Sequence, residues 1–119
     1  MGLEQFYEHI GGELDEVRQR LIKDERIEKY VVRFAQSDDR PQLCSLLEQK
    51  DYKGAFMRAH DIKGTSATLG FPAVYSCASL LCDALRGGEP CEDISPLVEQ
   101  LGSECDKVAA AVSAFIQAK

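Results

Sequence analysis

The sequence predicts an all-α protein, built as an antiparallel up-down four-helix bundle with short additional N-terminal helices. Apolar residues recur at helical spacing through most of the 119 residues. No stretch alternates apolar and polar residues over strand length, and no hairpin turn signal occurs. The long helical segments are joined by short connections, which favour antiparallel neighbours. We expect one domain over residues 1–119, because this length suits a single core.

Four shorter helical segments are expected in the N-terminal half: residues 3–10, about 13–21, a third that follows residue 24 and is interrupted at residues 37–41, and a fourth from 41 onward. The first ends at Gly11-Gly12, a plausible helix terminus. Asp24 is a candidate N-cap for the third segment. Pro41 cannot continue a helix but suits the first turn of a new one. The pattern leaves open whether the third and fourth segments form one bent rod or two separate helices.

Three longer helices are expected in the C-terminal half: residues 52–69, about 72–86, and from 95 to near the C-terminus. Asp51 is a candidate N-cap for the first of them. Gly70 ends that helix, and Pro72 suits the first turn of the next. So short a link makes the two helices antiparallel. Ser95 is the candidate N-cap of the last helix, whose apolar seam is close to a heptad repeat.

The charge balance bears on the kind of partner. The formal net charge is −6, from 14 basic and 20 acidic side chains. Phosphate contacts need clustered Lys and Arg, so a nucleic-acid partner is not expected. No apolar run approaches the roughly 18 residues of a membrane-spanning helix, and no signal peptide is evident. We therefore expect a cytoplasmic protein without a membrane partner, and a monomer.

The five cysteines are Cys44, Cys77, Cys82, Cys91 and Cys105. Their number is odd, and no pair has C-x-x-C spacing. In a reducing cytosol, buried thiols act as small hydrophobic residues. The spacings fit no common zinc pattern and the chain has only two histidines, so no metal site is expected. A redox or metal sensor that uses the cysteines after Cys44 is a less favoured alternative.

Residues 59–70 carry the most informative pattern in the chain. The core stripe of this predicted helix consists of Phe56, Ala59, Ile62, Ser66 and Leu69. His60 lies at the edge of that stripe, with Lys63 and Gly64 one turn further on. A glycine within a helix costs about 1 kcal/mol relative to alanine, so it requires a reason. Leaving the imidazole open to another molecule would be such a reason.

Phosphoryl transfer suits these side chains. An unprotonated imidazole can attack phosphorus, and a free imidazole titrates near pH 6.5. Lys63 can neutralise phosphoryl oxygens, while Gly64 and Ala67 leave the approach to the ring open. The chain has no glycine-rich nucleotide-binding loop. A partner would therefore have to bring the phosphoryl group.

The pattern His60-x-x-Lys63-Gly64-x-Ser66-x-x-Leu69-Gly70 resembles the signature of histidine-containing phosphotransfer (HPt) domains. The resemblance extends from about residue 13 to the C-terminus. It implies a phosphoryl carrier without kinase activity of its own, which relays the group between aspartates of receiver domains in a multistep phosphorelay. The implied partners are response-regulator receiver domains and a hybrid sensor kinase. Mg²⁺ would be bound by the receiver, and no cofactor is expected on this chain.

The resemblance also assigns roles to residues. His60 would be the phospho-acceptor, Lys63 would stabilise phosphoryl charge, and Gly64 would provide steric clearance. Ser66 and Leu69 would be packing residues. The residues implied at the partner-binding face are Ala67, Phe71, Cys82 and Arg86. Cys82 stands about where some family members have a glutamine that orients the histidine, and Arg86 is a candidate second cation.

A different function class is a helical scaffold that binds a receiver domain or another signalling partner without phosphotransfer. Apolar patches on a pair of helices are enough for such binding. The presence of His60 favours phosphotransfer, because a pure binder has no need of that residue. His9 lacks comparable neighbours and is expected to be an ordinary surface residue.

Overall fold

The computed structural model describes residues 2–117, and every regular element in that range is an α-helix. The seven helices are α1 (Leu3–Ile10), α2 (Leu14–Leu21), α3 (Asp24–Gln36), α4 (Asp39–Glu48), α5 (Tyr52–Leu69), α6 (Pro72–Leu85) and α7 (Ser95–Gln117). The predicted all-α class is confirmed. So are the Asp51 cap, whose carboxylate accepts a hydrogen bond from the Gly54 amide at 2.9 Å, and the left-handed Gly70 that ends α5.

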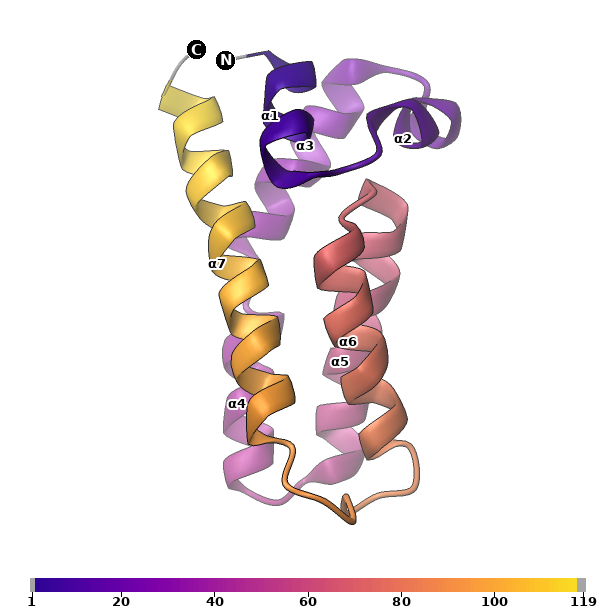
Figure 1. Ribbon diagram of the computed structural model, residues 1–119, viewed down its shortest axis with the longest axis vertical. Coiled ribbons are helices and arrows are strands. Elements are labelled where there is room, and N and C mark those ends of the chain that lie inside the picture. The colour runs from indigo at the N-terminus through magenta and orange to yellow at the C-terminus, as the bar shows by residue number, and fades with distance from the viewer. Residues whose placement is uncertain (1, 118–119) are drawn as a thin grey trace.

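Helices α4 to α7 form an antiparallel bundle along the longest axis of the molecule (Figure 1). Helix α3 follows the direction of α4 and lies along α7, while α1 and α2 lie across the end of the bundle that holds the α5–α6 turn. The molecule measures 43 × 26 × 19 Å. Helices α3 and α4 are separate, with a break at residues 37–38 that settles the alternative left open by the sequence.

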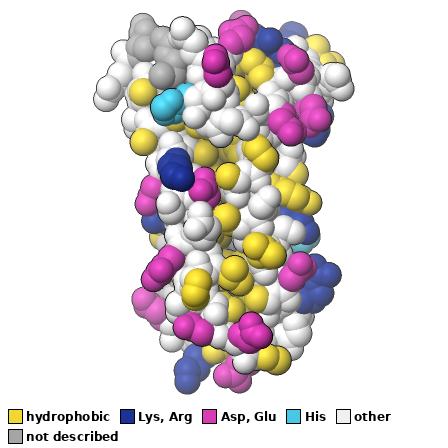
Figure 2. All heavy atoms as spheres, in the orientation of Figure 1, with side chains coloured by type: hydrophobic (Ala, Val, Ile, Leu, Met, Phe, Trp, Pro, Cys, Tyr) yellow, Lys and Arg dark blue, Asp and Glu magenta, His cyan; other side chains and the backbone are white. Residues whose placement is uncertain are grey.

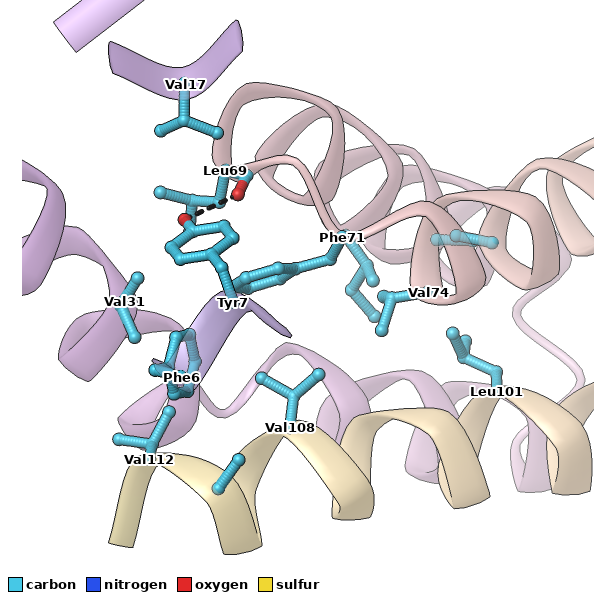
Figure 3. Packing of buried hydrophobic residues seen from close by; sticks show 14 of the residues in the cluster. Phe6, Tyr7, Val17, Val31, Leu69, Phe71, Val74, Leu101, Val108 and Val112 are labelled. Atoms are coloured by element: carbon cyan, nitrogen blue, oxygen red, sulfur yellow. Dashed lines mark hydrogen bonds between the residues drawn. The ribbon is translucent and has the colours of Figure 1, made fainter. Parts of the chain in front are cut away.

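The core runs the length of the bundle and contains side chains from all seven helices. Around the end that holds the N-terminal helices, Phe6 of α1 lies between Val31 of α3 and Val112 of α7 (Figure 3). Three large side chains on the apolar sides of their helices are nevertheless 36–47% exposed: Tyr30, Tyr75 and Ile116. Tyr30 and Tyr75 lie at the edges of the apolar faces of α3 and α6, and Ile116 lies at the end of α7.

A junction formed by Tyr7, Gly12, Glu13, Leu69 and Gly70 joins the N-terminal helices to the end of α5. The Tyr7 hydroxyl donates to the Leu69 carbonyl at 2.7 Å (Figure 3), and the Glu13 amide donates to the Gly70 carbonyl at 3.1 Å. The two turns approach so closely that a Cβ on Gly12 would lie 2.8 Å from the Gly70 oxygen. We refer to these five residues as the Gly12–Gly70 junction.

The face formed by α6 and α7 carries a band of hydrophobic side chains along its middle, with charged side chains on both sides (Figure 2). Leu80 of α6, which is 56% exposed, is among the apolar side chains that remain open to solvent. Within residues 2–117, no helix is both long and apolar enough to cross a membrane.

Replacing Tyr7 with phenylalanine tests the Gly12–Gly70 junction. The change deprives the Leu69 carbonyl of a buried donor, and the free energy of unfolding should fall by about 1–3 kcal/mol. Urea unfolding measures this loss. Tyr52→Phe is the matched control, because Tyr52 is half-buried and its hydroxyl makes no hydrogen bond within the described residues. Equal losses in both variants would show that the Tyr7 hydrogen bond has no special part in stability.

Candidate functional site

Helix α5 has a buried side and an open side, and His60 lies on the open one. The residues that face the core are Ala55, Ala59, Ile62, Ser66 and Leu69, all less than 5% exposed. His60 is exposed, as the motif predicts. Its ring lies beside that of Phe56, with the centroids 6.0 Å apart and the planes at 39°. The imidazole is therefore held next to the bundle surface without being enclosed by it.

Gly64 lies one turn after His60 and has no internal reason to be glycine. It sits within the regular helix, and a Cβ added to it would meet nothing within 4 Å. Gly70 differs, since its φ of +69° favours glycine and its Cβ would lie 2.6 Å from a methyl of Val17. The packing of this chain thus explains Gly70 but leaves the glycine at position 64 unexplained.

Ser66 and Leu69 are packing residues, as the sequence predicts. Ser66 is fully buried, and its hydroxyl donates to the carbonyls of Ile62 at 2.8 Å and Lys63 at 3.0 Å. A small side chain whose polar atom bonds within its own helix lets a neighbouring helix pack closely. Leu69 is 1% exposed. Both residues fix how α5 lies in the bundle, which sets the direction of His60.

Lys63 lies half-buried on the side of α5 that faces α6. Its ammonium nitrogen is 5.8 Å from the centroid of the Tyr75 ring, a cation–π contact across the α5–α6 hairpin. Lys63 makes no ion pair within the described residues. No carboxylate of residues 2–117 therefore neutralises its positive charge.

The opposite side of α5 is held by Arg58. Its guanidinium contacts the Asp61 carboxylate at 2.9 Å and the Asp39 carboxylate at 3.3 Å. Because Asp39 is the first residue of α4, this arginine ties α5 to the break between α3 and α4. The negative charge of Asp61, which follows His60 in the chain, is thereby compensated by the arginine.

Arg20 of α2 caps the C-terminal end of α5. Its guanidinium donates to the carbonyls of Ala67 at 2.9 Å and Thr68 at 3.1 Å. A cation at this end of a helix satisfies unpaired carbonyls and complements the helix dipole. Together with the Gly12–Gly70 junction, this contact anchors α5 at the end that follows His60.

The structure contradicts the expectation that Phe71 and Cys82 lie at the partner-binding face. Phe71 is 2% exposed, because the rings of Phe6, Tyr7 and Phe34 surround it at centroid distances of 5.2–6.3 Å. Cys82 is fully buried. Neither side chain reaches the surface, so neither can contact a docked protein.

The buried Cys82 is also a poor substitute for an orienting polar group. Burial raises the pKa of its thiol, and the nearby positive charges of Lys63 and Arg86 offset that rise only in part. A neutral thiol is a weak hydrogen-bond donor. Within residues 2–117, no hydrogen bond or ion pair joins His60 to Lys63, Cys82 or Arg86.

The other two residues expected at the partner-binding face, Ala67 and Arg86, are accessible to solvent. Ala67 is exposed and lies about two turns after His60 on the same side of α5. Arg86 is exposed at the end of α6 and pairs with Asp83 at 3.3 Å, both side chains being about two-thirds exposed. An ion pair as open to solvent as this one contributes little to stability. Partner contacts by Ala67 and Arg86 stay predictions.

A cleft of about 1060 Å³ opens beside His60, between α5, α7 and the break between α3 and α4. His60 and Gly64 lie on its border, together with Thr65 of the same helix. The histidine is therefore open to solvent on this side. A reactant can approach the ring from solvent.

Three of the cysteines, Cys77, Cys82 and Cys105, are poorly suited to a sensor function. Burial raises the pKa of Cys77 and Cys82, and raises that of Cys105 to about 11. A raised pKa makes a thiol a poorer nucleophile and metal ligand, since the thiolate is the reactive form. In the part of the chain that the structure describes, no group of three His, Cys, Asp or Glu side chains is placed to hold a metal ion.

Sequence reasoning missed several contacts around the motif, made by residues of α5 itself and of other helices. Tyr75 contacts Lys63 from the edge of the apolar face of α6, and this edge position is the one sequence signal that could have indicated contact with α5. Arg20 and Arg58 contact residues 47 and 19 positions away in the chain, respectively, and nothing local marks them. Phe56 was expected in the core and is half-buried beside His60.

Fold and site together define a helical bundle that presents one open histidine on a rigid helix. A family model described as the Hpt domain matches residues 3–111. The chain belongs to this family, which supports a role in histidine phosphotransfer in two-component signalling. Comparison with curated proteins found no match, and comparison with solved structures found none either.

Replacing Gly64 with alanine tests whether the fold needs this glycine. Because the added Cβ meets open space within a regular helix, the free energy of unfolding should rise by about 0.5–1 kcal/mol. Denaturant unfolding measures the change. Gly54→Ala in the same helix is the control, since its Cβ would lie 2.7 Å from the capping carboxylate of Asp51 and should remove the gain. A loss of stability in Gly64→Ala would contradict this reading.

Proposed function

We propose that this protein relays a phosphoryl group between receiver-domain aspartates in a multistep phosphorelay, through phosphorylation of His60. The observation that carries the proposal is the pairing of an exposed histidine with a glycine that the chain's own packing does not require. The glycine lowers helix stability without an internal benefit. A benefit to an incoming reactant accounts for it, because a side chain at position 64 would stand one turn from the attacking ring.

The proposed step needs only groups that the two proteins supply. An unprotonated imidazole nitrogen of His60 forms a bond to the phosphorus of a receiver's aspartyl phosphate. The P–O bond to the aspartate breaks, its electron pair stays on the carboxylate, and the other ring nitrogen releases its proton to water. The same steps in reverse pass the group to the aspartate of a second receiver. Catalysis then depends on positioning and charge compensation.

Lys63 is the proposed source of charge compensation. It lies one turn from His60, and its ammonium has no carboxylate partner among the described residues. Asp61, which would otherwise repel an incoming phosphoryl group, is paired with Arg58. The local charge near the ring is therefore more favourable to an anion than the net charge of −6 suggests.

The partners belong to the proposal as well. Receiver domains and a hybrid sensor kinase are the partners that the resemblance implies, with Mg²⁺ held by the receiver. Ala67 and Arg86 are proposed contacts, since both are exposed. A cytoplasmic location and a monomeric state stay predictions from the sequence.

Labelling from a phosphorylated receiver tests the proposal. A receiver carrying ³²P on its aspartate should transfer acid-labile, alkali-stable phosphate to this chain. His60→Gln should abolish the label while leaving the helical circular dichroism unchanged, because the side chain is exposed. His9→Gln removes the only other histidine and should keep the label.

Three outcomes would count against the proposal. Undiminished labelling of His60→Gln would place the phosphate elsewhere. Loss of label in His9→Gln alone would assign the wrong histidine. A panel of phosphorylated receivers that binds the wild-type chain without ever labelling it would favour the non-catalytic scaffold.

A further inference from the structure

The contact between Lys63 and Tyr75 gives the Lys63 ammonium a defined position. The ammonium nitrogen lies over the Tyr75 ring at 5.8 Å from its centroid. The ring is 39% exposed, so it is not needed to fill the core.

This position draws the ammonium away from His60. Helices α5 and α6 lie side by side as an antiparallel hairpin closed at Gly70 and Phe71 (Figure 1). At a rise of about 1.5 Å per residue, Tyr75 stands about 5 Å from this turn along the hairpin, Lys63 about 10 Å and His60 about 15 Å. Along the axis of the hairpin, Tyr75 and His60 therefore lie on opposite sides of Lys63.

The carboxylates of Asp61 and Asp83 pair with arginines and form no ion pair with Lys63. Asp61 pairs with Arg58, and Asp83 pairs with Arg86. A cation–π contact at a partly exposed site is weaker than the pairing of an ammonium with a phosphoryl dianion. The flexible lysine side chain can exchange one partner for the other by rotating its own bonds.

We propose that Tyr75 is a positioning residue whose ring holds Lys63 in a resting position, from which the ammonium moves to the phosphoryl group on His60. This inference rests on the proposed function. The ring and the phosphoryl group compete for the same Lys63 ammonium. Tyr75 thereby sets how readily Lys63 assists the transfer.

Labelling by phosphoramidate tests this competition without a cognate receiver. A ring nitrogen of His60 forms a bond to phosphorus, the P–N bond of the donor breaks, and ammonia leaves and takes up the proton that the ring releases. Tyr75→Leu frees Lys63 from the ring, so labelling should become about two- to fivefold faster. Tyr75→Phe keeps the ring and should retain the wild-type rate. Phosphorus NMR follows both reactions.

Two further variants separate the positioning role from a structural one. In the Lys63→Met background, Tyr75→Leu should no longer change the rate, because the ring acts only through the lysine. Tyr52→Leu removes a half-buried tyrosine at the start of α5 that lies outside the cleft beside His60, and it should leave the rate unchanged. Ring-current shifts of the Lys63 ε-methylene protons should be present in wild type and Tyr75→Phe.

The outcomes separate this inference from the function on which it rests. A Tyr75→Leu rate equal to or below that of wild type would overturn the resting position, as would an acceleration that persists in Lys63→Met. Unshifted Lys63 protons in wild type would overturn it even if Tyr75→Leu fails to fold. Failure of phosphoramidate to label wild type at all would instead contradict the reactivity of His60, and the shift of the Lys63 protons would still report on the contact.

Discussion

The close approach of two turns at the Gly12–Gly70 junction is the constraint on which the site depends. Tyr7 and Glu13 donate hydrogen bonds to the last carbonyls of the α5 end, and the absence of side chains on the two glycines allows the backbones to meet. Arg20 satisfies two further carbonyls of the same helix. Helix α5 is thus fixed at one end by α1 and α2, and along its length by α4 and α6. A histidine on a helix held in this way has a defined direction.

Stability and chemistry occupy different sides of α5. The core side carries Ala59, Ile62 and Leu69, which are buried and unreactive. The open side carries His60 and a glycine that reduces the stability of the helix. Between the two sides, Arg58 compensates Asp61, while Lys63 contacts the Tyr75 ring and has no carboxylate partner among the described residues. The charges near the imidazole are therefore arranged by residues outside the motif, one on α5 itself and one on α6.

Local signals in the sequence predicted the elements well. Asp51, Gly70 and Pro72 mark helix ends by their own conformational preferences, and the apolar stripe of α5 predicted the exposure of His60. Long-range packing was beyond such reasoning. The burial of Phe71 depends on three rings from α1 and α3, and that of Cys82 on how α6 meets its neighbours. The contact of Lys63 with Tyr75 likewise depends on the register of two antiparallel helices.

The central claim is that His60, on a helix that stays fixed, takes up the phosphoryl group. Imidazole nitrogen NMR of the wild-type chain tests it directly, because only two histidine rings contribute signals. After reaction with a phosphorylated receiver, phosphorus should couple to the ring of His60, and the hydrogen-exchange protection of α5 should be unchanged. Phosphorus on the ring of His9, or a phosphorylated His60 accompanied by loss of protection along α5, would contradict this account.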